Sequence, residues 1–125
     1  MKKILIVEDV EFNRDLLVQL LEESFEIVTA VDGLSCIEIA ERSLPDLILM
    51  DISLPVIDGL KATQKIKAIQ ALKDIPVIAV TAHAMRGDRE RILASGCDDY
   101  LSKPIDEDIL FAKLQQFLGE PTPGP

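Results

Sequence analysis

The sequence predicts one α/β domain in which an open, five-stranded parallel sheet carries helices on both faces. Three observations support this fold class. The chain has 125 residues, which suits a single domain with a single core. Short apolar runs alternate with amphipathic stretches five times from end to end. Apolar residues make up 48% and aromatic residues only 4%, so Ile, Leu, Val and Ala must build the core, as in buried parallel strands.

Five short segments predict the strands. The first, third and fourth are nearly continuous apolar runs, which is typical of central strands buried on both faces. The predicted strands are Lys3–Val7, Ile27–Val31, Leu47–Met50, Val77–Val80 and Asp99–Leu101.

The stretches between the strands have the apolar spacing of helices. In the first helix the residues of the apolar stripe are Phe12, Leu16, Leu17, Leu20 and Leu21. The next three helices are predicted at Leu34–Arg42, Leu60–Ile69 and Arg89–Ala94. Ser95-Gly96 is a stop signal for the last of these, and Cys97 behind it is expected to be a small buried residue.

The fifth helix is predicted over Asp106–Leu118, with Asp106 as its N-cap and Ile109 in its apolar stripe. Gly119 ends this helix. Residues 120–125 contain three prolines and are expected to be a disordered tail or the start of a linker, which leaves residues 1–119 as the domain.

Charge and composition exclude several classes of function. The formal net charge is −9, so the domain lacks the basic surface that direct nucleic-acid binding needs. No apolar run approaches the roughly 20 residues that span a bilayer. Cys36 and Cys97 have neither metal-ligand nor disulfide spacing, so we expect reduced structural thiols in a cytoplasmic protein.

Polar residues follow four of the five predicted strands. Glu8 and Asp9 come after the first strand, Asp51 after the third, Thr81 after the fourth and Lys103 close after the fifth. Each of them alone is typical of an ordinary solvated turn. However, the carboxyl ends of parallel strands meet at one edge of the sheet, where binding sites of open α/β folds form. The sequence therefore predicts that these five side chains converge there.

Three carboxylates in one place call for a cation. Two of them ~4 Å apart repel by roughly 4 kcal/mol at an effective dielectric of about 20. Hard oxygen donors favour Mg²⁺, with Mn²⁺ as the alternative. A magnesium ion beside a lysine and a threonine suits a transferring phosphoryl group, and Asp51 is the central candidate for the nucleophile.

The chain resembles the receiver domains of two-component response regulators over about residues 2–118. The motifs that carry the resemblance are Ile6–Asp9, Leu49–Pro55, Asp58-Gly59, Val80–Ala82 and Leu101–Pro104. The resemblance implies a flavodoxin-like (βα)5 fold with strand order 2-1-3-4-5. Within the family, the chain is most similar to single-domain regulators of the DivK kind and to receivers of hybrid kinases, through Glu8–Arg14 and Thr81–Asp88.

The resemblance also implies roles for the acidic residues. Asp51 is the phosphoacceptor. Asp9, Asp51 and the backbone carbonyl of Ser53 are expected to bind Mg²⁺, with Glu8 acting mostly through water. Thr81 and Lys103 are expected to hold phosphoryl oxygens.

A further group of residues is expected to tune or transmit the signal. Pro104 is expected to follow a cis peptide that aims Lys103 into the site, and Tyr100 to turn inward as Thr81 moves toward the phosphoryl group. His83 is a loop residue that is expected to tune dephosphorylation.

The implied partners are proteins. A sensor histidine kinase or a histidine phosphotransfer protein supplies the phosphoryl group, docking near the first helix, and a downstream protein reads the surface around the fourth helix, fifth strand and fifth helix. The domain is expected to be a monomer or a weak phosphorylation-dependent dimer. It is not expected to be an enzyme beyond catalysing its own phosphorylation and dephosphorylation.

Three other functions fit the residues less well. An aspartate-nucleophile phosphatase would require a second aspartate at the position of Ser53. A nucleotide or flavin module would want a glycine-rich loop after the first strand, but Val7–Val10 contains no glycine. A scaffold that works without phosphorylation would not need the complete set of acids, threonine and lysine.

Overall fold

A computed structural model describes residues 1–54, 57–82 and 86–119. Its five strands are β1 (Lys3–Val7), β2 (Glu26–Ala30), β3 (Leu47–Asp51), β4 (Val77–Thr81) and β5 (Asp99–Ser102). Its five helices are α1 (Glu11–Leu21), α2 (Gly33–Ser43), α3 (Gly59–Lys67), α4 (Arg86–Ala94) and α5 (Glu107–Leu118). His83 and the predicted tail lie outside the described residues.

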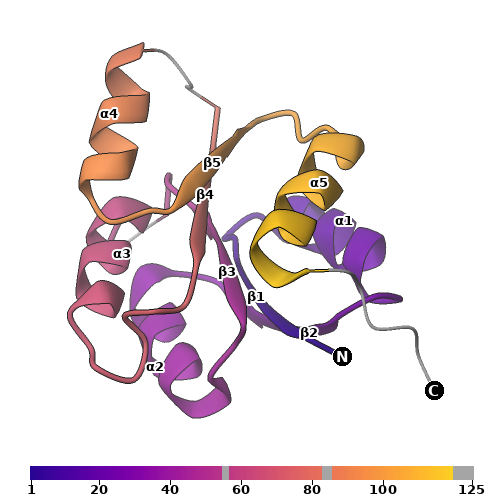
Figure 1. The fold of residues 1–125 in the computed structure, drawn as a ribbon, viewed down its shortest axis with the longest axis horizontal. Helices are drawn as coiled ribbons and strands as arrows, with labels where there is room; N and C mark the ends of the chain where they lie inside the picture. Colours follow the sequence, from indigo (N-terminus) through magenta and orange to yellow (C-terminus); the bar gives the residue numbers. More distant parts are fainter. Residues whose placement is uncertain (55–56, 83–85, 120–125) are drawn as a thin grey trace.

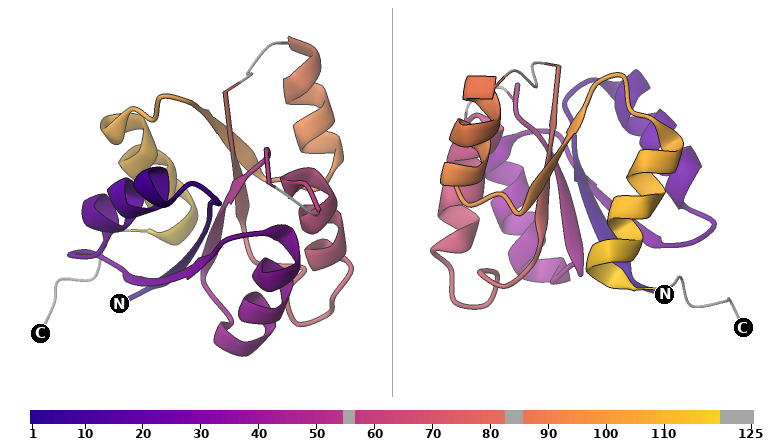
Figure 2. Two further views of the ribbon diagram at one scale, coloured as in Figure 1. Left: turned by 180° about the vertical axis from the view of Figure 1, so that it is seen from behind. Right: turned by 45° about the horizontal axis from the view of Figure 1, so that its top comes forward.

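The strands form one parallel sheet in the order β2-β1-β3-β4-β5, which confirms the predicted fold class and strand order. Helices α1 and α5 cover one face of the sheet, and α2, α3 and α4 cover the other (Figure 1). The tilted view in Figure 2 shows the sheet nearly edge-on between these two layers. The strand order changes direction at β1, which has β2 on one side and β3 on the other.

Each face of the sheet has its own apolar core. Leu5, Ile48 and Ile66 belong to the core beneath α2, α3 and α4. Ile4, Leu49, Leu17 and Leu114 are part of the core beneath α1 and α5. Every residue of β3 and β4 is buried, and so are Ile4–Val7 of β1, which confirms the prediction for the three continuous apolar runs.

Side-chain caps set the start of several helices. The Asp106 carboxylate accepts a hydrogen bond from the Ile109 backbone N–H at 3.1 Å, which confirms Asp106 as the N-cap of α5. Asp58 caps α3 in the same way by accepting from Lys61 N at 2.9 Å. Helix α4 ends before Gly96, whose φ of 107° lies in the left-handed region that favours glycine. Cys97 behind it is buried, as predicted.

Some predicted boundaries were wrong by a few residues. Strand β2 begins at Glu26 and ends at Ala30, one residue earlier than predicted, because Ala30 pairs with Val7 and Val31 already faces solvent. Helix α4 begins at Arg86 rather than Arg89. Its first turn is polar, so apolar spacing gave no signal there.

The predicted apolar stripes are only partly buried. On α1, Leu17 and Leu21 reach the core, whereas Phe12 is 71% exposed and Leu16 is 47% exposed. On α5, Ile109 is about half exposed. The apolar residues of α1 span more of the helix circumference than one sheet face can cover, so the outer ones remain at the surface.

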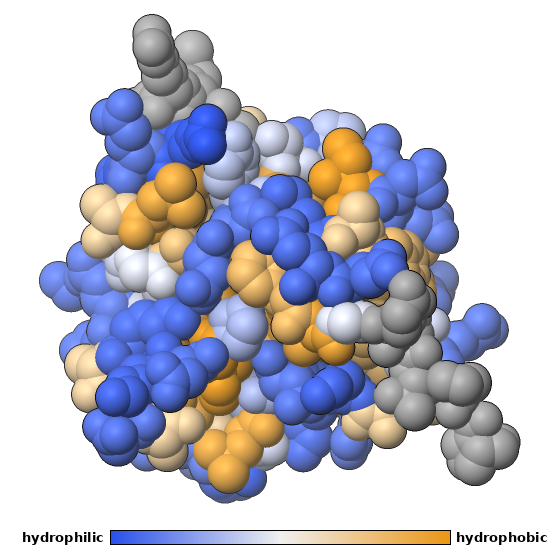
Figure 3. Space-filling model, viewed as in Figure 1, coloured by the Kyte–Doolittle hydropathy of each residue, from blue (hydrophilic) through white to orange (hydrophobic). Residues whose placement is uncertain are grey.

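The face of the molecule seen in Figure 3 is mainly polar. The view in Figure 3 shows hydrophilic side chains over most of this face, with apolar residues in separate patches. Within the described residues, no helix is long and apolar enough to cross a membrane.

Candidate functional site

The strand register brings the predicted site residues to one edge of the sheet. At the carboxyl ends of the strands, Val7 pairs with Met50, Asp51 with Val80, and Thr81 with Ser102. The residues that end or follow these strands therefore lie side by side, although Glu8 and Lys103 are 95 positions apart in the chain.

Three acids gather at this edge. Glu8, Asp9 and Asp51 each offer a carboxylate oxygen, and these oxygens lie within 4.8 Å of one another. Glu8 and Asp51 are only 3% and 4% exposed, whereas Asp9 is exposed. Two buried carboxylates with a third at the opening make a hard, anionic donor set that fits Mg²⁺ or Mn²⁺.

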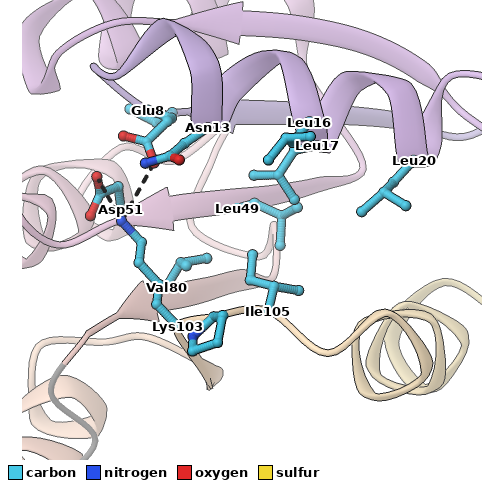
Figure 4. Close-up of a pocket in the computed structure, with 12 residues that line it drawn as sticks. Glu8, Asn13, Leu16, Leu17, Leu20, Leu49, Asp51, Val80, Lys103 and Ile105 are labelled. Atoms are coloured by element: carbon cyan, nitrogen blue, oxygen red, sulfur yellow. Dashed lines mark hydrogen bonds and ion pairs between the residues drawn. The ribbon is translucent and has the colours of Figure 1, made fainter.

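A lysine reaches across from β5 to the two buried acids. Lys103 Nζ lies 3.5 Å from Glu8 Oε1 and 3.5 Å from Asp51 Oδ2. Figure 4 shows the ammonium group between the two carboxylates, with a dashed line to each. Both distances are at the long end for ion pairs, and one positive charge faces two or three negative ones. The cluster therefore remains deficient in positive charge.

Two backbone features flank Lys103 at the end of β5. The Lys103–Pro104 peptide bond is cis. The Lys103 backbone N–H donates to the Thr81 carbonyl oxygen at 2.7 Å, which ties the chain after β5 to the end of β4. Thr81 itself is buried at this edge.

Burial raises the pKa of Glu8 from its ordinary value of 4.5 to about 7. The neighbouring Asp51 carboxylate, to which a protonated Glu8 donates, raises this pKa further. The Val10 backbone N–H, which donates to Glu8 Oε2 at 3.2 Å, and the Lys103 charge oppose the shift without cancelling it. Glu8 thus keeps its proton to near neutral pH unless additional positive charge arrives.

This shift predicts a pH dependence of stability in the metal-free protein. Between about pH 4.5 and pH 7, folded Glu8 holds a proton that the unfolded chain has released, so raising the pH favours unfolding. We expect the free energy of unfolding to fall by on the order of 2 kcal/mol across this window from this group. Urea titrations with a chelator present at about pH 5 and about pH 7.5 measure the change.

Glu8→Gln should remove this component of the pH dependence, and Glu38→Gln, at an exposed position on α2, is the matched control. An identical pH profile for wild type and Glu8→Gln would contradict the assignment.

The backbone around Asp51 is closely packed. The Ser53 backbone N–H donates to Asp51 Oδ1 at 3.0 Å, and Ser53 itself is exposed. Gly59 N donates to the Ile52 carbonyl at 2.9 Å. A Cβ added at Gly59 would collide with the Asp51 carbonyl oxygen, so only glycine lets α3 begin against this loop.

Tyr100 lies on β5, beyond the acid cluster. It is half-buried and packs against the core beneath α2, α3 and α4. Lys113 of α5 forms an ion pair with Asp99 at 2.8 Å, and its Nζ lies 6.0 Å from the centre of the Tyr100 ring. The Tyr100 side chain thus lies on the α2–α4 face of the edge strand β5, within reach of Lys113 of α5.

Two features of the site were not predicted from the sequence. Arg14 donates from its guanidinium to the Glu8 carbonyl oxygen at 3.0 Å and holds the chain after β1 against α1. In addition, a cleft runs from the acids along α1, past Asn13 and Leu16. The exposed position of Leu16 was hidden because its spacing is that of a core residue.

Comparison with known proteins points to one family. Residues 4–115 match the family described as the response regulator receiver domain. The polar-differentiation response regulator DivK of Brucella ovis is 45% identical over 120 residues, which is 95% of this chain and 98% of that protein. The DivK protein of Brucella melitensis is equally similar.

Solved structures agree with this result. The receiver domain of the sensor histidine kinase PA1611 from Pseudomonas aeruginosa, with a magnesium ion coordinated in its active-site cleft, has a TM-score of 0.88 and 39% identity, covering 95% of this chain and 98% of that one. The receiver domain of the Saccharomyces cerevisiae response regulator Ssk1, solved with the histidine phosphotransfer protein Ypd1, has a TM-score of 0.87 and 28% identity, covering 93% of this chain and 88% of that one.

Proposed function

The chain belongs to the response regulator receiver domain family, and on that premise we propose that it is switched by a Mg²⁺-dependent phosphorylation of Asp51. It is a receiver domain of two-component signal transduction, a family that is not one of enzymes in the usual sense. The observation that carries the proposal is the buried Asp51 carboxylate, which lies close to two other acids and one lysine.

The proposed reaction is the transfer of a phosphoryl group from a phosphohistidine. An Asp51 carboxylate oxygen forms the new bond to phosphorus as the bond to the histidine nitrogen breaks. Lys103 and Thr81 hold phosphoryl oxygens at the ends of β5 and β4. Asp9, Asp51 and the Ser53 carbonyl would hold the magnesium ion, which supplies positive charge to the phosphoryl oxygens when bound. The domain catalyses only its own phosphorylation and dephosphorylation.

Magnesium fits this cluster because the acids are short of positive charge. We expect Asp9→Asn to weaken Mg²⁺ binding by more than about tenfold, since Asp9 would be a direct ligand. Glu8→Gln should weaken it less, because Glu8 would act through water and already shares its charge with Lys103. Titration of Mg²⁺ followed by calorimetry measures both affinities. Equal affinities in wild type and both variants would contradict these roles.

The source and the readers of the phosphoryl group are proposed to be proteins. The donor is a sensor histidine kinase or a histidine phosphotransfer protein that docks near α1, and the Ssk1 receiver, solved with the phosphotransfer protein Ypd1, supports this class of partner. The net charge of −9 favours a protein target over direct contact with nucleic acid.

Two further proposals concern the setting of the domain. Two buried, free thiols suit the reducing cytoplasm. Residues 120–125 are proposed to be a tail or the start of a linker, with residues 1–119 as the domain, acting as a monomer or a weak phosphorylation-dependent dimer.

We propose that Tyr100 transmits phosphorylation to the surface of α4, β5 and α5. Phosphoryl oxygens on Asp51 draw in the Thr81 hydroxyl, which opens space for the Tyr100 ring to turn inward. The two states need differ by only a few kcal/mol for such a shift of population.

Hydrogen exchange with and without beryllofluoride, a phosphoryl mimic, tests this route. We expect amides of α4, β5 and the start of α5 to change their protection along with the loop after Asp51, because these elements border Tyr100. The same measurement on Tyr100→Ala is the control. Changes confined to the Asp51 loop would contradict the route.

The proposed phosphorylation itself is tested by incubating the protein with a ³²P-labelled phosphotransfer protein, with Mg²⁺ and with a chelator. One acid-labile phosphoryl group per chain is expected only with Mg²⁺. Absence of transfer from any histidine-phosphorylated donor would count against the proposed function.

A further inference from the structure

The loop between β1 and α1 carries two of the three acids, and the two are held in different ways. Glu8 is buried, and its backbone N–H, its carbonyl oxygen and its carboxylate each have a hydrogen-bonding partner. Asp9 is exposed, and among the residues that the structure describes no hydrogen bond or ion pair holds its carboxylate. The direction of the Asp9 side chain therefore depends on the backbone of this loop.

Three hydrogen bonds fix that backbone at Glu8. The Glu8 N–H donates to the Ala30 carbonyl oxygen at the end of β2 at 3.0 Å. The Glu8 carboxylate accepts from the Val10 N–H at 3.2 Å, and the Glu8 carbonyl oxygen accepts from the Arg14 guanidinium at 3.0 Å. Ala30 and Val10 contribute backbone groups that almost any residue would supply. Only the third hydrogen bond depends on the identity of a side chain outside the loop, that of Arg14 on α1.

We propose that Arg14 is a positioning residue for magnesium binding. By holding the Glu8 carbonyl oxygen, it keeps the Asp9 carboxylate within reach of the Asp51 carboxylate, where the oxygens of the acids lie within 4.8 Å of one another. The inference rests on the proposed function and adds to it a residue that contacts neither the metal nor the phosphoryl group. Loss of a group that orients metal ligands typically weakens metal binding by roughly 10–100-fold.

The sign of the change in Mg²⁺ affinity separates this role from an effect of charge. The Arg14 guanidinium is positive and repels a cation bound beside Glu8, so its removal would strengthen Mg²⁺ binding if charge alone mattered. If Arg14 positions the loop, its removal releases the Glu8 carbonyl oxygen and lets Asp9 move away, which weakens binding. A residue that only supports the fold would change the unfolding temperature and leave the Mg²⁺ affinity of the folded protein unchanged.

The experiment titrates Mg²⁺ into wild type and Arg14→Met and follows backbone amide shifts by NMR, which also measures weak affinities. Methionine keeps most of the apolar stem of arginine but has neither its charge nor its hydrogen-bond donors, and it is a good helix former. We expect Arg14→Met to weaken Mg²⁺ binding by about threefold to tenfold. This loss is smaller than the typical one because removal of the positive charge acts in the opposite direction.

Unchanged or tighter binding of Mg²⁺ by Arg14→Met overturns the inference. Thermal unfolding in the presence of a chelator accompanies the titration, and a lower unfolding temperature together with wild-type Mg²⁺ affinity identifies a purely structural role. Arg42→Met is the matched control, because it removes the same charge from an exposed position in the last turn of α2. It should bind Mg²⁺ like wild type, and an equal loss in this variant also overturns the inference.

A double-mutant cycle tests whether Arg14 acts through Asp9. If the guanidinium serves to direct the Asp9 carboxylate, its removal has nothing left to disturb once that carboxylate is gone. We therefore expect Arg14→Met to cause no further weakening of Mg²⁺ binding in the background of Asp9→Asn. The same threefold to tenfold loss in both backgrounds overturns the action through Asp9.

The outcomes separate this inference from the proposed function. If wild type binds Mg²⁺ and is phosphorylated on Asp51, while Arg14→Met binds Mg²⁺ equally well, the inference fails and the proposed function stands. If wild type shows no Mg²⁺-dependent shifts around the three acids, the proposed metal site fails and the role of Arg14 fails with it.

Discussion

Asp51→Asn is expected to reduce phosphorylation by acetyl phosphate and by a phosphohistidine donor to background. The amide cannot form the acyl phosphate, and every other carboxylate of the cluster lacks the position of Asp51 at the end of the central strand β3. Phosphoryl incorporation in the presence of Mg²⁺, followed by intact-mass measurement under neutral conditions, gives the result directly.

The variant should still fold. The asparagine side chain has nearly the same shape, and its oxygen can still accept the hydrogen bond from the Ser53 backbone N–H. Loss of the Asp51 charge also removes one cause of the raised Glu8 pKa, so the metal-free domain should be at least as stable near neutral pH. Asp74→Asn, at an exposed position, is the charge-matched control and should be labelled like wild type.

One result would refute the role of Asp51 decisively. A label that persists in Asp51→Asn and is stable to acid would identify a hydroxyl group, such as that of a serine, as the acceptor. Thermal unfolding distinguishes loss of the phosphoacceptor from loss of the fold. Because the asparagine can still accept the hydrogen bond from the Ser53 backbone N–H, we expect Asp51→Asn to unfold cooperatively and at a temperature similar to that of wild type.

Lys103→Met is expected to slow phosphorylation of Asp51 by about 10²-fold or more, the loss typical of removing one group that stabilises developing charge. Lys103 Nζ is 3.5 Å from Asp51 Oδ2 and is 29% exposed in a largely enclosed cluster, so solvent cannot replace its charge effectively. The methionine keeps the length and apolar stem of the side chain. Single-turnover rates with a saturating phosphohistidine donor measure the chemical step.

A second observable distinguishes this role from a general loss of structure. Lys103 lowers the pKa of Glu8, so its removal should raise that pKa further in the metal-free protein. Lys3→Met is the control: Lys3 is a half-buried lysine at the opposite end of β1, where its Nζ donates to the Ser43 carbonyl at 2.9 Å. A rate equal to that of wild type in Lys103→Met, or equal losses in both variants, would contradict a direct role of Lys103.

Much of the fold was predictable because its signals are local. The runs at Ile4–Val7, Leu47–Met50 and Val77–Val80 are apolar at every position, and only a strand buried on both faces requires that pattern. Asp106 was recognised as an N-cap because its side chain acts on a backbone N–H three residues ahead. No local sequence signal predicts the order of the strands, and that prediction came from the family resemblance.

The prediction was least accurate where local pattern and tertiary packing differ. Phe12 and Leu16 share the spacing of the buried Leu17 and Leu21, yet only the latter two meet the sheet. The spacing of apolar residues is the same whether the whole apolar stripe of a helix is buried or its outer residues remain exposed beside a cleft. The start of α4 was missed for the opposite reason, since its polar first turn has no apolar period.

The sequence by itself determined which residues end the strands, and therefore that Glu8, Asp9, Asp51, Thr81 and Lys103 meet at one edge. Parallel strands require this, because their carboxyl ends all point the same way. The tertiary structure decided how these groups act on one another. It buries Glu8 and Asp51 but leaves Asp9 open, and it brings Lys103 across 95 positions to within 3.5 Å of both buried acids. The raised pKa of Glu8 and the cleft that runs from the acids along α1 follow only from that packing, because burial and distance are properties of the folded chain.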